Sequence, residues 1–189
     1  MPTLHVVAGP DGCGKSTLTR TTWFRGTEVI DPVAITGDTM ASYPAWAARE
    51  VLRRQQAAVA KGGTLAVETA LADAGVLQFM EVARQAGYRI VLQYVSVNTV
   101  SQALLRVRSR MTLGGDDVPA ADVRRRFARS HANLPLAILR ADEVVLYDNT
   151  DPAMPHREVA MLRDGEWWRA ERLPIWAAAA IVRAAANNP

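Results

Sequence analysis

Short apolar runs alternate with longer amphipathic stretches from the N-terminus to about residue 150. Each run is bounded by glycine, proline or charged residues, which is typical of strands buried within a sheet. The runs predicted to form strands are residues 4–8, 28–32, 64–68, 89–95 and 143–147. Because strands that alternate with helices favour parallel pairing, the pattern predicts an α/β fold in which helices cover both faces of a parallel sheet.

Apolar residues recur at helical spacing between these runs. The predicted helix over residues 100–111 places its apolar residues on one face and the pair Arg106 and Arg110 on another. Proline disfavours a helix interior, so Pro135 predicts that the helix beginning near Pro119 is interrupted. The predicted helices are residues 18–23, 42–61, 73–86, 100–111 and the interrupted helix from 119 onward.

The last part of the chain has a different pattern. Two short runs, residues 158–162 and 167–171, flank Asp164-Gly165, a pair that favours a tight hairpin. The adjacent tryptophans of the second run are expected to cover the core rather than to stack on nucleobases. Since no linker, repeat or low-complexity stretch separates the two parts, we expect residues 1–189 to form a single domain.

Composition predicts a soluble globular protein. Hydrophobic residues make up 49% of the chain and the mean hydropathy is −0.03. No apolar run reaches the roughly 18 residues that a membrane helix needs, and the first residues resemble a strand rather than a signal peptide. We therefore expect a cytoplasmic protein that does not act at a membrane. Cys13 is the one cysteine, which excludes an internal disulfide and a cysteine-based metal cluster.

Arginine supplies most of the positive charge. The net charge is +3, and Lys15 and Lys61 are the only lysines among the 22 basic residues. Seven arginines lie between residues 106 and 129. Such a cluster can bind phosphates or nucleic acid, but nucleic-acid-binding proteins usually interleave aromatic residues for stacking. Only Phe127 lies within the cluster, so the pattern favours phosphate contacts and disfavours nucleic acid.

The most informative motif lies between the first predicted strand and the first predicted helix. Its glycines allow the backbone to turn tightly, so that successive N–H groups can surround a polyphosphate. Lys15 would reach the terminal phosphates, and the Ser16 hydroxyl would bind Mg²⁺. The motif therefore predicts a P-loop that binds ATP and Mg²⁺. Its spacing is G-x-x-x-x-G-K-S, and it comprises Gly9, Pro10, Asp11, Gly12, Cys13, Gly14, Lys15, Ser16 and Thr17.

Polar residues end the other predicted strands. Ligands bind beside the carboxyl ends of parallel strands, so Asp31, Glu68, Thr69 and residues 148–149 are expected to gather near the P-loop. Glu68 and Thr69 are candidates for substrate binding, and Glu68 is alternatively the acidic partner of Mg²⁺. Asp31 is the first candidate for the base that takes the proton of an acceptor hydroxyl, with Asp38 as its competitor.

Phosphoryl transfer requires positioning and positive charge more than it requires covalent chemistry. Arginines on a mobile lid supply this charge only when nucleotide is bound, which also excludes water. We assign Arg106, Arg110 and Arg126 to such a clamp, within a lid-like segment over residues 103–132. His131, which lies at the end of this segment, is expected at the protein surface.

Four blocks of the sequence together resemble the zeta-toxin family of P-loop kinases. The blocks lie within residues 7–17, 67–71, 106–130 and 141–149, and the similarity extends from about residue 4 to residue 149. The resemblance implies an adenylate-kinase-like fold, ATP with Mg²⁺, and phosphoryl transfer to the hydroxyl of a small molecule. Glu68 corresponds to the substrate-binding glutamate of the family, and the arginine-rich segment corresponds to its phosphate-clamping lid.

The resemblance also implies an acceptor and a partner. Characterised toxins of the family phosphorylate UDP-N-acetylglucosamine and are held inactive by a small antitoxin protein. Two positions depart from the family pattern: Val33 stands where an Asp usually accepts the proton, two residues after Asp31, and Asp116 stands where His commonly follows the Gly-Gly pair.

Three functions are therefore compared. The favoured one is an ATP-dependent small-molecule kinase that resembles zeta toxins. The alternatives are a housekeeping metabolite kinase on the same fold, and a catalytically weak nucleotide-dependent switch or RNA-binding protein.

Overall fold

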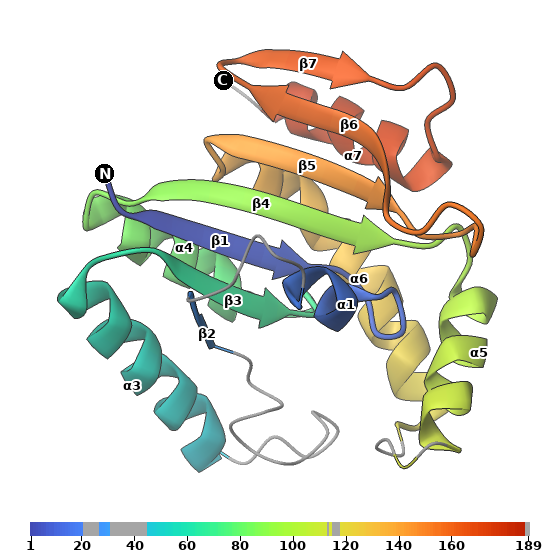
Figure 1. Ribbon diagram of the computed structural model, residues 1–189, viewed down its shortest axis with the longest axis horizontal. Helices are drawn as coiled ribbons and strands as arrows, with labels where there is room; N and C mark the ends of the chain where they lie inside the picture. Colours follow the sequence, from blue (N-terminus) through green and yellow to red (C-terminus); the bar gives the residue numbers. More distant parts are fainter. Residues whose placement is uncertain (21–26, 31–44, 113, 115–117, 188–189) are drawn as a thin grey trace.

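The computed structural model describes residues 1–20, 27–30, 45–112, 114 and 118–187. These residues form a mainly parallel sheet flanked by helices (Figure 1), which confirms the predicted α/β fold. The strands are β1 (Thr3–Ala8), β2 (Glu28–Ile30), β3 (Leu65–Thr69), β4 (Arg89–Ser96), β5 (Glu143–Asp148), β6 (Arg157–Arg163) and β7 (Glu166–Arg169). The helices are α1 (Lys15–Thr19), α3 (Ala45–Lys61), α4 (Gly75–Gln85), α5 (Val100–Met111), α6 (Ala120–Leu139) and α7 (Ile175–Ala186).

The order of the strands places β1 inside the sheet. The order is β2-β3-β1-β4-β5-β6-β7, with parallel pairing from β2 to β5 and antiparallel pairing from β5 to β7. The last residue of β1, Ala8, pairs with Thr69 on one side and with Tyr94 on the other. The loop that follows β1 therefore leaves the sheet between the carboxyl ends of β3 and β4, at the edge where parallel sheets bind ligands.

Side chains of β1 point alternately to the two faces of the sheet, so the strand contributes to two hydrophobic clusters. Leu4 and Val6 belong to a large cluster that β1 shares with α4, α6 and α7. Val7 belongs to a smaller cluster on the other face, where Leu18 of α1 and Ala103 of α5 cover the sheet. Because both faces are covered, the central strands are apolar along nearly their whole length. None of the helices in the described part of the chain is both long enough and apolar enough to cross a membrane.

The predicted break at Pro135 is wrong. Helix α6 runs without interruption from Ala120 to Leu139 and contains Pro135 in its interior. Proline removes one helical hydrogen bond, but Leu134, Pro135 and Ala137 are all buried in this stretch. Packing of this apolar face keeps the helix continuous, because burial of several side chains outweighs the loss of one hydrogen bond.

The predicted hairpin is confirmed. Asp164 and Gly165 connect β6 to β7 with φ values of 51° and 80°, as a two-residue turn with both residues in the left-handed region requires. Neighbouring strand residues face opposite sides, so Trp167 packs against the large core whereas Trp168 is 54% exposed. The expectation that the tryptophan pair covers the core holds for Trp167 and is wrong for Trp168.

Candidate functional site

The loop between β1 and α1 has a backbone that favours glycine at three positions, Gly9, Gly12 and Gly14, of which the last two contact distant parts of the chain. Gly12 and Gly14 have φ values of +76° and +99°, which residues with a side chain rarely adopt. A Cβ atom at Gly12 would lie 2.6 Å from the carbonyl oxygen of Ala103, and a Cβ atom at Gly14 would lie 2.5 Å from Nδ2 of Asn149. The loop is therefore packed against α5 on one side and against the segment after β5 on the other.

Lys15 lies across the loop that precedes it. Its Nζ atom donates a hydrogen bond to the carbonyl oxygen of Pro10 at 3.1 Å, which holds the ammonium group at the loop. Cys13 contributes a buried side chain, and burial raises the pKa of its thiol to about 11. The thiol therefore stays protonated near neutral pH, so Cys13 serves the loop as a small buried residue rather than as a nucleophile.

Glu68 joins the P-loop to the end of β3. The Ser16 hydroxyl donates to Glu68 Oε1 at 2.8 Å, and the Thr19 hydroxyl donates to Glu68 Oε2 at 3.0 Å. The carboxylate is only 8% exposed, so these two hydrogen bonds replace most of its hydration. The structure thus places the two predicted metal- or substrate-binding residues, Ser16 and Glu68, in direct contact.

The three arginines assigned to the clamp lie in different environments. Arg126 of α6 approaches the P-loop, with 3.2 Å between its Nη1 and Oδ2 of Asp11, and the two side chains are only 12% and 16% exposed. This Asp11 oxygen accepts no directed hydrogen bond within the described residues, so the contact is mainly electrostatic. Arg106 of α5 donates to the carbonyl oxygen of Asn149 at 2.7 Å. Arg110 is exposed, and its guanidinium has no polar partner in the described part of the chain.

Asn149 and His156, from the segment between β5 and β6, contact the P-loop from outside. Nδ2 of Asn149 donates to the carbonyl oxygen of Cys13 at 2.8 Å, and Nε2 of His156 lies 3.0 Å from the carbonyl oxygen of Gly14. The expectation that residues 148–149 approach the P-loop is therefore confirmed for Asn149. The contact of His156 was not predicted, because nothing in the local sequence indicates it.

The prediction of a surface position for His131 is wrong. Its ring stacks on Trp176, meets Phe127 edge-on, and Nε2 lies 2.8 Å from the Ser96 hydroxyl. Burial lowers the pKa of this histidine to about 4. The ring is therefore neutral near pH 7 and is part of the packing between α6, α7 and β4.

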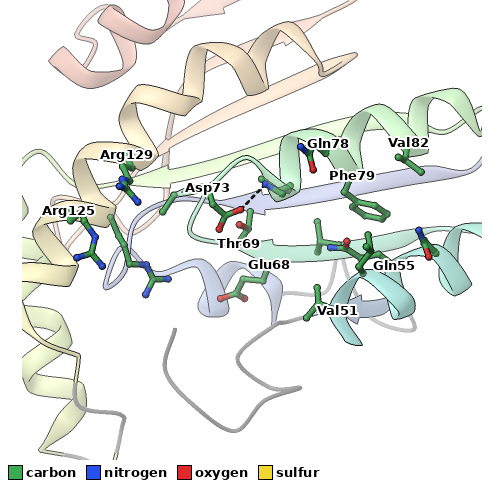
Figure 2. A pocket seen from close by; sticks show the side chains of 17 residues that line it. Val51, Gln55, Glu68, Thr69, Asp73, Gln78, Phe79, Val82, Arg125 and Arg129 are labelled. Atoms are coloured by element: carbon green, nitrogen blue, oxygen red, sulfur yellow. Dashed lines mark hydrogen bonds between the residues drawn. The ribbon is translucent and has the colours of Figure 1, made fainter. Parts of the chain in front are cut away.

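A pocket of about 590 Å³ adjoins Glu68. Figure 2 shows arginines of α6 at one end of the pocket and apolar residues of α4 at the other, with Glu68 and Thr69 between them. The pocket thus combines an apolar end with a cationic end next to the P-loop. Its lining includes Val51 and Gln55 of α3, Glu68 and Thr69 of β3, Gln78, Phe79 and Val82 of α4, and Arg125, Arg126 and Arg129 of α6.

Both candidate bases lie outside the described residues. Asp31 and Asp38, with Val33 between them, belong to residues 31–44. Asp116 also lies outside the described part of the chain. The assignment of the base therefore stays a prediction. The pocket residues of α3 and α4 were not predicted, since an apolar residue that lines a pocket has the same helical spacing as one that lines a core.

Comparison with solved structures identifies the fold. A chain in the AvrRxo1-ORF1:-ORF2 structure with ATP is 15% identical and superposes with a TM-score of 0.69, covering 100% of this chain and 65% of its own length. This chain thus spans slightly less than two thirds of that protein.

Two other solved structures have a similar fold. A chain from the PezAT toxin-antitoxin system of Streptococcus pneumoniae is 15% identical, with a TM-score of 0.60, covering 97% of this chain and 85% of its own. A putative kinase from Chloroflexus aurantiacus is 16% identical, with a TM-score of 0.56 and coverages of 80% and 90%. No protein-family model matches the sequence, and no curated protein matches it either. The structural likeness shows that the chain shares the fold of these three solved structures.

Proposed function

We propose that the protein is an ATP-dependent phosphotransferase that transfers the γ-phosphate to a hydroxyl of a small molecule. One observation carries the proposal. Glu68 accepts a hydrogen bond from Ser16 of the P-loop and also lines the pocket of about 590 Å³. A site for the phosphate donor and a cavity for a second molecule therefore share one carboxylate, as a kinase with two substrates requires.

The residues of the loop suit a bound triphosphate. Gly12 and Gly14 permit the close backbone turn, and the N–H groups of Gly14 and Lys15 donate to no other residue in the described part of the chain. Lys15 adds a cation held at the same loop. Free amides beside a cation favour an anionic ligand, and the ATP in the AvrRxo1-ORF1:-ORF2 structure makes ATP the natural candidate.

The donor set also suits Mg²⁺. Magnesium prefers hard oxygen ligands and usually takes one or two from the protein and the rest from phosphates and water. Ser16 and Glu68 place a hydroxyl and a carboxylate 2.8 Å apart. Ser16 would bind the ion directly and Glu68 would hold it or its water. The ion would supply charge that neutralises the phosphate oxygens during transfer.

The transfer itself needs few groups. The acceptor oxygen forms a bond to the γ-phosphorus while the bond to the β-phosphate oxygen breaks, and ADP leaves with that electron pair. The acceptor proton passes to a base, for which Asp31 and Asp38 are the candidates. Both oxygens of Glu68 already accept hydroxyl hydrogen bonds, which favours a role for Glu68 in holding the metal or the substrate over a role as the base.

The acceptor that we propose first is UDP-N-acetylglucosamine, the substrate implied by the family resemblance. Its diphosphate suits the arginines at one end of the pocket, and Glu68 and Thr69 suit its hydroxyl groups. A different metabolite with an anionic group and a hydroxyl would satisfy the same features, so a housekeeping kinase remains the second candidate.

An antitoxin is the partner that we propose. The PezAT neighbour belongs to a toxin-antitoxin system, and the AvrRxo1-ORF1 neighbour is a complex with AvrRxo1-ORF2. If this chain is a toxin, its expression arrests growth and the Lys15→Ala variant does not. Normal growth with a fully active enzyme would favour the housekeeping kinase instead.

The decisive experiment uses labelled ATP. The protein is incubated with γ-labelled ATP and Mg²⁺ against sugar nucleotides, nucleosides and a metabolite extract, and labelled products are identified by mass. We expect one labelled small molecule, and none with Lys15→Ala. ATP binding without transfer to any acceptor would reject the kinase and favour the nucleotide-dependent switch.

A further inference from the structure

The carbonyl groups on the outer side of the P-loop are held by a segment far away in the sequence. Asn149 Nδ2 donates to the carbonyl oxygen of Cys13 at 2.8 Å. The carbonyl oxygen of Gly14 lies 3.0 Å from His156 Nε2, and because a carbonyl only accepts, the ring must donate through this nitrogen. Two consecutive peptide groups are thus anchored from behind.

The geometry of the peptide gives these anchors a function. In a planar trans peptide, the C=O and N–H groups point in opposite directions. The Cys13 carbonyl shares its peptide with the Gly14 N–H, and the Gly14 carbonyl shares its peptide with the Lys15 N–H. Donors that hold the two carbonyls outside the loop therefore turn the two N–H groups away from that side. Neither N–H group donates to another residue in the part of the chain that the structure describes.

Asn149 is itself fixed on every side. Its backbone N–H donates to the Ser96 carbonyl at 2.8 Å, its carbonyl accepts from Arg106 at 2.7 Å, and its Oδ1 accepts from the His156 N–H at 3.2 Å. His156 has φ 52°, a conformation that costs energy for a residue with a side chain. A strained backbone held by a fully bonded neighbour is rigid, which is what an anchor requires.

Gly14 shows how closely the anchors approach. A Cβ atom there would lie 2.5 Å from Asn149 Nδ2 and 3.1 Å from His156 Nε2. The Gly14 carbonyl also accepts from Thr17 and Leu18 of α1, at 3.2 and 3.3 Å. Asn149 is by contrast the only donor to the Cys13 carbonyl among the described residues. The two anchors are therefore unequal, and Asn149 carries more of the constraint.

We propose that Asn149 and His156 are positioning residues that orient the phosphate-binding N–H groups of Gly14 and Lys15. The inference rests on the proposed binding of ATP by the P-loop. According to this inference, the segment between β5 and β6 raises the affinity for nucleotide without touching it. The segment acts by holding the backbone of the P-loop. Because Asn149 also binds Arg106, the same residue sets the position of an arginine of the predicted clamp relative to the loop.

The test compares variants that keep the shape of each anchor with variants that remove its donor. Asn149→Asp replaces the donating nitrogen with an oxygen of similar size, and His156→Leu removes the ring donor, whereas His156→Gln keeps an amide donor. Met154→Ala is the matched control, because Met154 lies on the same segment and is 54% exposed. ATP affinity is measured by calorimetry, and the amide resonances of Gly14 and Lys15 are followed by NMR during titration with Mg-ATP.

The variants are expected to lose ATP affinity to different degrees. Loss of an orienting hydrogen bond should weaken ATP binding about tenfold in Asn149→Asp, and by less in His156→Leu. His156→Gln should recover most of the affinity, and Met154→Ala should bind as the unaltered protein does. The shifts of the Gly14 and Lys15 amides on ATP binding should shrink in Asn149→Asp and His156→Leu, a change that loss of stability alone would not produce.

Several outcomes would overturn the inference. Unchanged ATP affinity in both donor-removing variants would do so, as would affinity losses that follow the melting temperature while the Gly14 and Lys15 amide shifts stay unaltered. If Asn149→Asp does not fold, the comparison of His156→Leu with His156→Gln decides alone. ATP binding without transfer to any acceptor would reject the proposed kinase and leave this inference standing, whereas failure of the unaltered protein to bind ATP would reject both.

Discussion

Replacement of Glu68 by Gln tests the centre of the proposed site. The change keeps the size of the side chain and removes its charge. In the structure the two carboxylate oxygens accept hydrogen bonds from Ser16 and Thr19 at 2.8 and 3.0 Å. Glutamine keeps one of these acceptors and presents an NH₂ group to the other hydroxyl, which can rotate to accept. The fold is therefore expected to tolerate the substitution.

The energetic consequences for folding and for activity differ. A hydrogen bond to a charged group exceeds a neutral one by about 1 kcal/mol, so two weakened bonds cost about 2 kcal/mol. Glu68 is only 8% exposed, and relief from burying its charge offsets a cost of this size, so the free energy of unfolding should change by about 1 kcal/mol or less. No such compensation exists when Mg²⁺ is bound, and kcat/KM at low Mg²⁺ should fall about 10- to 100-fold.

The assay is ATP consumption coupled to acceptor phosphorylation over a range of Mg²⁺ concentrations. Glu81→Gln, an exposed carboxylate on α4, is the control and should behave as the unaltered protein does. If Glu68 holds the metal or its water, high Mg²⁺ restores part of the activity of Glu68→Gln. If it binds the acceptor, the KM for the acceptor rises at every Mg²⁺ concentration. Activity equal to that of the control throughout would refute both roles.

Three further predictions concern other residues. Lys15→Ala should abolish ATP binding in calorimetry, because the loop loses its cation, and retained affinity would contradict the P-loop assignment. Arg126→Ala should lower kcat more than Arg110→Ala, since only Arg126 reaches both Asp11 and the pocket, and equal losses would argue against that ranking. The pKa of His131 is about 4 in the folded protein against 6.5 when unfolded, so its neutral ring contributes stability that is fully present above pH 6.5. This contribution, about 3 kcal/mol, is lost as pH falls from 6.5 to 4, and His131→Gln should flatten that dependence in denaturant titrations; an unchanged slope would show that another group is responsible.

Elements with a local cause were predicted well from the sequence. Gly62 and Gly87 follow α3 and α4 with φ values of 73° and 81°, the left-handed conformation in which glycine ends a helix. The hairpin at Asp164-Gly165 has the same kind of cause. The P-loop is likewise encoded by the spacing of neighbouring residues, and its contact with Glu68 follows from the pairing of β1 with β3.

Features with a distant cause could not be predicted in this way. His131 was expected at the surface because of its place by the predicted lid, but Trp176 and Ser96 come from other elements and pack against it. His156 reaches the Gly14 carbonyl across more than a hundred residues of sequence. Pro135 led to a wrong prediction for a related reason. Its strong local preference against helix is outweighed by the packing of α6.

The structure ranks arginines that the sequence left equal. Arg110 is exposed, so water and salt screen its charge and its attraction to a phosphate is weak. Arg126 is 12% exposed, and in such surroundings the same charge acts more strongly. Arg126 faces the Asp11 carboxylate, whose Oδ2 accepts no directed hydrogen bond within the described residues, so the guanidinium donors stay available. A phosphate offers more charge and several acceptor oxygens, so we expect it to compete favourably with Asp11 for the same arginine.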